Sequence, residues 1–171
     1  MKRGNWLVGE ANPCDAVEIT RLINLAYRVE DFFKAVDRTT VEEVRRYLEE
    51  EAFLAVRDES GDLLACVRLG LRPPEGHFGM LSVHPDVQGQ GIGRLLVSEA
   101  EERARRSGCT RMTLEVASPR TELPAYYARL GYVIAGRAPW PASALHQLKQ
   151  PAHFIVMTKA LGPTPAEDHD G

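Results

Sequence analysis

The sequence is poor in features that would place it in several common classes of protein. Its only cysteines, Cys14, Cys66 and Cys109, are far apart and form no CxxC pair. This pattern argues against a disulfide framework or a cysteine metal site, and it predicts a reducing, cytoplasmic location. No apolar run approaches the roughly 18 residues of a membrane span, and no apolar signal region follows Met1-Lys2-Arg3. No membrane partner is therefore expected.

An excess of positive charge is also missing. The chain has 21 Lys+Arg against 24 Asp+Glu, a net charge of −3, so nucleic acid is not an expected partner. Hydrophobic residues make up 44% of the chain, enough for a globular core, and 171 residues predict a single domain. We assign residues 1–161 to this domain and expect the Pro/Gly-rich segment 162–171 to be a disordered, metal-free tail.

Hydrophobic periodicity predicts a mixed α/β fold. Helices are expected after Pro13-Cys14-Asp15, from Thr40, after a glycine cluster near residue 91, and over Leu123–Leu130. The expected strands cover Trp6–Val8, Phe53–Arg57, Leu63–Leu71, His77–Val83, Met112–Val116, Tyr132–Ala135 and Phe154–Lys159. The segment 136–152 reads as one irregular loop, and a loop of that length is more often functional than accidental.

The sharpest local feature is the sequence Gln88-Gly89-Gln90-Gly91-Ile92-Gly93-Arg94 between a strand and a helix. Alternate glycines allow a tight turn, and the helix start points free N–H groups at the loop, which suits a phosphate or pyrophosphate. Arg94 stands where a Rossmann loop needs its third glycine, and no GxxxxGK[ST] string occurs. The alternative for the loop alone is a plain glycine-rich turn.

Two segments together resemble the GNAT superfamily of acetyl-CoA-dependent N-acyltransferases. Gln88, Gly91 and Gly93 match its [Gln/Arg]-x-x-Gly-x-[Gly/Ala] pattern after a strand ending in Val-x-Pro. Downstream, the segment 125–132 is similar to the family's Tyr-x-x-x-Gly-[Phe/Tyr] pattern. The two motifs occur in the family's order, and the resemblance extends over residues 6–160. It implies a single mixed sheet of about seven strands flanked by about four helices.

The resemblance also implies acetyl-CoA (coenzyme A) as co-substrate, with no metal. In the family the first motif holds the pyrophosphate through backbone N–H groups, and the end of the preceding strand pairs with the pantetheine arm. One departure is Arg120, which stands where the family often has an asparagine, so one coenzyme contact is in question. The cofactor-binding residues implied are Leu81, Ser82, Val83, Gln88, Gly89, Gln90, Gly91, Ile92, Gly93 and Arg94. Arg120 is a further candidate for the cofactor, with contact to the substrate or a plain surface position as the alternatives.

For catalysis, the resemblance implies direct attack of a neutral amine on the thioester. Tyr127, four residues before Gly131, matches the tyrosine that hydrogen-bonds the departing sulfur. The base is open: His77 suits the task by its pKa near 6.5 and shares a strand face with Gly79, yet a plain exposed histidine is an equal alternative. Glu30, Glu115 and a water relay are the other candidates.

For the acceptor, we expect a small molecule with a primary amine, with a carboxylate that Arg28 or Arg38 could bind. Its site should lie between the first helix-to-helix loop and segment 136–152, which contains Trp140, His146 and Lys149. Two alternatives remain: a protein or peptide amine, which needs an open groove, and a non-catalytic acyl-CoA sensor. Whether segment 136–152 closes over the cleft distinguishes the first two. Homodimer formation is left open.

Overall fold

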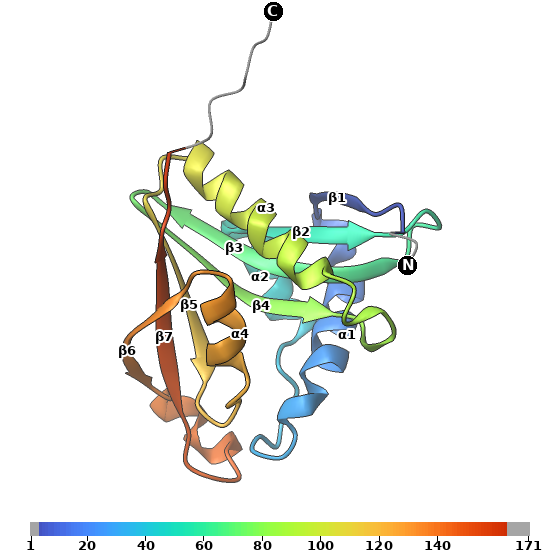
Figure 1. The fold of residues 1–171 in the computed structure, drawn as a ribbon. Helices are drawn as coiled ribbons and strands as arrows, with labels where there is room; N and C mark the ends of the chain where they lie inside the picture. The colour runs from blue at the N-terminus through green and yellow to red at the C-terminus, as the bar shows by residue number, and fades with distance from the viewer. Residues whose placement is uncertain (1–3, 164–171) are drawn as a thin grey trace, which may run out of the picture.

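The structure, a computed structural model, describes residues 4–163 and confirms the expected mixed α/β fold (Figure 1). One seven-stranded sheet has the order β1-β2-β3-β4-β5-β7-β6. Only β4 and β5, its two central partners, run parallel; every other pair is antiparallel. The strands are β1 (Leu7–Glu10), β2 (Ala52–Arg57), β3 (Leu63–Arg72), β4 (Glu75–Val83), β5 (Arg111–Ala117), β6 (Val133–Pro139) and β7 (His153–Ala160).

Four α-helices cover the two faces of the sheet: α1 (Ala16–Ala26), α2 (Val41–Glu50), α3 (Ile92–Arg106) and α4 (Leu123–Arg129). Helices α1 and α2 lie behind the sheet in Figure 1, and α3 and α4 lie in front. Strand β2 shows how the sequence produces this, because its buried residues alternate between faces. Phe53 and Ala55 pack with α1 and α2, whereas Leu54 and Val56 pack with α3.

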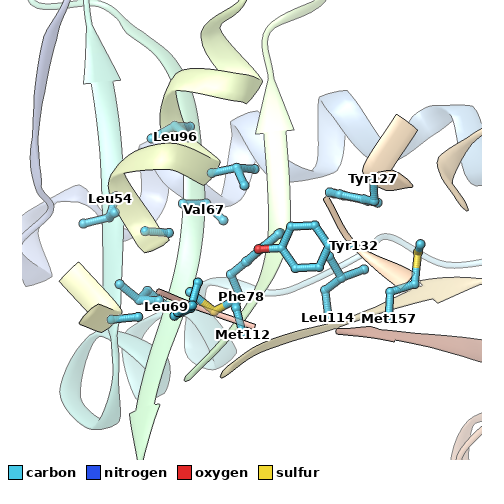
Figure 2. Packing of buried hydrophobic residues seen from close by; sticks show 14 of the residues in the cluster. Leu54, Val67, Leu69, Phe78, Leu96, Met112, Leu114, Tyr127, Tyr132 and Met157 are labelled. Atoms are coloured by element: carbon cyan, nitrogen blue, oxygen red, sulfur yellow. The ribbon is translucent and has the colours of Figure 1, made fainter. Parts of the chain in front are cut away.

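The core on the α3 side continues across β5 and β7 and meets α4 (Figure 2). Phe78, Tyr127 and Tyr132 pack there with ring centroids 5.8 to 6.0 Å apart. The buried carboxylate of Glu101 anchors α3 to this cluster. Its Oε2 accepts the Tyr132 hydroxyl at 2.9 Å, and its Oε1 pairs with Lys159 of β7 at 2.8 Å. The long helix is thereby fixed to the far half of the sheet.

Strands β4 and β5 separate after a short ladder. Their ladder has only three pairs, the last of which joins His77 to Thr113, although β4 continues to Val83 and β5 to Ala117. Beyond this point the two strands diverge, and the edges that face each other have no ladder partners. A strand edge with free N–H and C=O groups can pair with another extended molecule.

Strand β4 contains a β-bulge just beyond the point where it separates from β5. The register to β3 shifts between Cys66 and Arg68, so two residues of β4 oppose one of β3. Met80 is the bulged residue, with a φ of 54°. Its side chain packs on the α1/α2 side although Phe78, two residues earlier, packs on the α3 side. The extra residue of a bulge stays unpaired, which leaves backbone groups free beside the gap.

The expectation of one irregular loop over residues 136–152 was wrong at its start. Strand β6 continues to Pro139, because a second register shift between Ile134 and Gly136 lets it keep pairing with β7. A short 3-10 helix, Ala142–Gln147, follows. The predicted tail lies outside the described residues except for its first two. Of the helices within residues 4–163, none combines the length and the apolar character needed to cross a bilayer.

Candidate functional site

The start of α3 is built to leave its backbone N–H groups free. Gly89 and Gly91 have φ values of 78° and 85°, which side chains other than glycine rarely tolerate. Gly91 is the N-cap residue and provides no side-chain cap, and the first turn contains no acidic residue. The helix dipole and the uncapped N–H groups therefore favour an anion.

A cavity of about 520 Å³ lies between this helix start, the end of β4 and α4. It brings together most of the predicted cofactor residues: Leu81, Val83, Gln88, Gly89, Gly91, Ile92, Gly93, Arg94 and Arg120. Two others do not line it. Gln90 is exposed, and the buried Ser82 directs its hydroxyl to the Met80 carbonyl at 3.0 Å, so only its backbone is free to act.

Tyr127 lies where this cavity meets a second one and lines both. It comes from α4 and packs edge-on against Tyr126 and Tyr132. Burial raises the pKa of its hydroxyl far above the ordinary value of 10. The group therefore stays a neutral hydrogen-bond donor throughout the pH range in which proteins are stable.

The second cavity has a volume of about 590 Å³ and opens on the α1/α2 side of the gap. Its size is that of a small-molecule site. Aromatic walls are provided by Tyr27, Tyr47, Trp140 and Phe154, and Trp140 is stacked on Phe154 with centroids 4.5 Å apart. Charged groups of both signs complete the lining, among them Glu30, Lys34, Arg38, Arg68 and Glu115. Arg28, one of the two arginines expected to bind a carboxylate, is exposed and does not line it.

His77 belongs to a cluster with Arg68 and Glu51 at the edge of this cavity. Nη1 of Arg68 lies 3.0 Å from Nε2 of His77 and 2.9 Å from Oε2 of Glu51. Because a guanidinium only donates, His77 must accept at Nε2 and carry its proton on Nδ1. Gly70 opposes His77 in the ladder, and a Cβ at Gly70 would be 2.4 Å from His77 Cε1. The glycine is needed for the imidazole to lie there.

The pKa of His77 gives a stability prediction. Burial lowers it below 6.5, and Arg68 adds to this, while Glu51 acts in the opposite direction. Between the folded pKa and about 6.5 the unfolded chain binds more protons, so stability falls as the pH drops through this window. We expect His77→Gln to reduce the loss of Tm between about pH 7 and pH 5. The exposed His146→Gln is the matched control, and equal slopes in all three proteins would contradict the prediction.

Arg120 is held by a buried carboxylate from the other half of the molecule. Oε2 of Glu30 accepts from its Nη1 at 3.0 Å, and Oε1 of the same carboxylate pairs with Lys34 at 3.0 Å. Glu122 binds Nε of Arg120 as well. Both oxygens of Glu30 are thus used in ion pairs, which makes it a structural link across the gap and a poor candidate for a base. Arg120 still borders the first cavity.

The segment after α1 and the segment before β7 are joined across the second cavity. Lys34 and Leu148 form a β-bridge, with hydrogen bonds from Ala35 N to Gln147 O and from Lys149 N to Phe33 O, both at 2.8 Å. The Lys149 ammonium adds a bond to the Asp31 carbonyl at 2.7 Å. We call residues 31–35 and 147–149 the strap. Figure 1 shows these two segments side by side at the lower end of the fold.

The comparison with family models decides the classification of the chain. Residues 18–132 match the model described as the Acetyltransferase (GNAT) family. The chain belongs to this family. The matched region contains the glycine loop, the separated strands and Tyr127.

Curated relatives of the chain include acetyltransferases with different names. The chain is 37% identical over 102 residues to an "Amino-acid acetyltransferase" of Ralstonia nicotianae, and 28% identical over 90 residues to a "5-NmdU N-acetyltransferase" of Pseudomonas phage PaMx11. These matches cover 58% and 52% of this chain. They cover 22% and 62% of the relatives, so the chain spans only part of the length of each.

Solved structures share the fold along nearly the whole chain. A putative acetyltransferase from Salmonella typhimurium, yncA, solved with its cofactor acetyl-CoA, aligns with a TM-score of 0.71 over 96% of this chain and 99% of its own, at 21% identity. A GNAT acetyltransferase from Streptococcus pneumoniae aligns with a TM-score of 0.70 over 92% of this chain and 100% of its own, at 23% identity. At these identities the likeness concerns the fold.

Proposed function

We propose that this family member transfers the acetyl group of acetyl-CoA to the primary amine of a small molecule. The observation that carries the small-molecule assignment is the strap. The bridge between Lys34 and Leu148 joins the two segments that border the cavity, and Lys34 and Gln147 line it, so a long peptide chain has less room beside these segments than a small amine. The cavity that remains has the volume of a small-ligand site.

The residues present fit the coenzyme. Uncapped N–H groups at the start of α3, beside Arg94, suit a pyrophosphate. Gly93 leaves room for the Tyr126 hydroxyl, since a Cβ there would be 3.0 Å from it. The unpaired edge of β4 over Leu81, Ser82 and Val83 offers amide partners to the pantetheine arm. Acetyl-CoA, when bound, supplies the activated thioester.

Tyr127 and the bulge would act on the reacting atoms. In the reaction the amine nitrogen bonds to the thioester carbon, the C–S bond breaks, and its electron pair goes to sulfur. A backbone N–H of the bulged strand near Leu81 would stabilise charge on the thioester oxygen. The Tyr127 hydroxyl donates a hydrogen bond to the departing sulfur; its raised pKa makes full proton transfer to a thiolate unfavourable.

Two residues are candidates for the general base that accepts the proton of the amine. His77 lines the cavity and is neutral, but it can act as the base only after its Nε2 lone pair is released from Arg68. Glu115 lines the cavity from β5, two residues beyond Thr113, the partner of His77. It therefore lies across the gap from Gly79. Comparing His77→Gln with Glu115→Gln in kcat at saturating acceptor separates the two assignments.

We also retain a cytoplasmic location as a proposal. All three cysteines are free thiols, and burial raises the pKa of Cys66 to about 12, which makes it unreactive. Unpaired cysteines, one of them exposed, are typical of a reducing compartment.

The test is an acceptor panel read by release of free coenzyme A thiol. Small primary amines and short peptides with a free N-terminus or lysine are supplied at equal concentration with acetyl-CoA. We expect turnover with members of the small-amine set and at least about 10-fold lower kcat/KM for every peptide, because the strap leaves less room for the longer chain. Preferential turnover of peptides would refute the small-molecule assignment, and no turnover with any amine would refute the proposed activity.

A further inference from the structure

One arginine side chain in the acceptor cavity has hydrogen-bond partners for only part of its guanidinium. Arg68 projects from β3 and is fixed from three directions: its guanidinium is stacked on Tyr47 at 4.4 Å, and Nη1 binds Glu51 and His77. Within residues 4–163, Nε of Arg68 is buried and has no hydrogen-bond partner. Nε and Nη2 form the edge of a guanidinium that holds a carboxylate through two parallel bonds. That edge is the part of Arg68 without a partner.

A buried donor without a partner is costly, and such cases call for an explanation. Within the described residues only two buried side-chain atoms are in this state, Arg68 Nε and Trp140 Nε1. Both residues line the same cavity. They approach it from opposite sides, since Arg68 is on β3 and Trp140 follows β6 at the other end of the sheet. Both unsatisfied groups are donors, so the ligand that fits must provide acceptor atoms.

The strand register places a second charge opposite Arg68. In the ladder Arg68 is the partner of Gly79 on β4. Glu115 lies across the gap on the other side of Gly79, as argued above from the pair His77 and Thr113. Gly79 has no side chain, and a Cβ there would be 2.9 Å from Nη2 of Arg68. The Arg68 guanidinium therefore lies directly over the glycine, with Glu115 across the gap and the bulge beside it.

From this arrangement we propose that the acceptor is an α-amino acid or a close analogue, whose carboxylate binds the Nε and Nη2 edge of Arg68 over Gly79. The proposal rests on the proposed acetyl transfer and specifies its substrate class. The carboxylate on Arg68 leaves the α-amino group, separated from it by one carbon, beside the bulge and on the Glu115 side. The rest of the amino acid then extends toward Trp140 and Phe154. Arg68, and not the exposed Arg28, is the specificity-determining arginine.

The test compares each common L-amino acid with its primary amide and with the amine left after decarboxylation, using thiol release with saturating acetyl-CoA. We expect at least one acid to have kcat/KM about 10- to 100-fold above its amide and its amine, the range of a charged, two-point hydrogen bond. The comparison with the amide is a strict one, because removing the carboxylate charge lowers the pKa of the amine and provides more of the reactive neutral form.

Three variants test whether the preference for acids over amides depends on Arg68. Arg68→Lys keeps the charge but loses the fork, and Gly79→Ala displaces the guanidinium, because its Cβ would be 2.9 Å from Nη2; each should reduce the acid-to-amide ratio to near one. The exposed Arg45→Gln on α2 removes a cation outside the cavity and should leave the ratio unchanged. Equal turnover of acids, amides and amines would overturn the proposal while acetyl transfer stands, and so would an acid preference that survives both variants. If no amine in any set reacts, the proposed function itself fails, and binding of acetyl-CoA by calorimetry then shows whether the cofactor site is also wrong.

Discussion

Gly91→Asp should weaken acetyl-CoA binding by about 100-fold or more, as measured by isothermal titration calorimetry. Gly91 is the N-cap of α3 and has a φ of 85°. An aspartate there places a negative charge among the N–H groups that we assign to the pyrophosphate. At an effective dielectric constant near 20, two like charges about 4 Å apart repel by roughly 4 kcal/mol, more than a 100-fold loss requires.

The other end of the same helix provides a matched control. Gly108 follows α3, has a φ of 88°, and like Gly91 has open space where a Cβ would be built. Gly108→Asp therefore imposes the same backbone strain and adds the same charge about one helix length away. The helix dipole makes an aspartate less favourable there than at the N-terminus, so the control should be the less stable protein. If both variants bind acetyl-CoA equally well, α3 does not hold the pyrophosphate.

Tyr127→Phe should lower kcat by about 100-fold and leave the Kd of acetyl-CoA within about threefold of the wild type. The hydroxyl is the group that would stabilise the leaving sulfur, and its contribution appears only as the C–S bond breaks. The ring remains, so the packing against Phe78 and Tyr132 is kept. Stopped-flow or steady-state thiol release gives kcat, and calorimetry gives Kd.

Tyr132→Phe is the control for loss of a tyrosine hydroxyl from the same cluster. It removes the 2.9 Å hydrogen bond to Glu101, which stays paired with Lys159. We expect it to reduce the free energy of unfolding by about 2 kcal/mol, measured in urea, with kcat unchanged. A Tyr127→Phe variant with normal kcat, or with kcat lowered only as much as in Tyr132→Phe, would remove Tyr127 from the reaction.

The parts of the site that the sequence predicted are those dictated by local geometry. A positive φ at Gly89 and Gly91 demands glycine, so the turn before α3 is visible in the sequence as a motif. The order and periodicity of the segments were sufficient to predict a mixed α/β fold, but they did not predict where β6 ends. There the register shift between Ile134 and Gly136 extends the strand past residues that look like a loop.

The acceptor side was much harder to predict, because it is made by contacts between distant segments. Backbone groups form most of the strap, and almost any sequence can make such bonds, so Lys34 and Leu148 carry no signal. The pair of Glu30 and Arg120 joins residues 90 positions apart. Arg68 did offer a signal, because it is a charged residue inside the apolar run 63–71. Which of its N–H groups lack partners could not be predicted, because this depends on how Glu51 and His77 bind its Nη1.

A crystal structure of the protein with acetyl-CoA tests the central claim most directly. We predict the pyrophosphate on the backbone N–H groups of Ile92, Gly93 and Arg94, and the pantetheine arm along Leu81, Ser82 and Val83. The thioester should then lie in the gap between β4 and β5 beside Tyr127, with the acceptor cavity under the strap on its other side. A coenzyme bound elsewhere, or a thioester that points away from Tyr127 and the acceptor cavity, would contradict this account of the site.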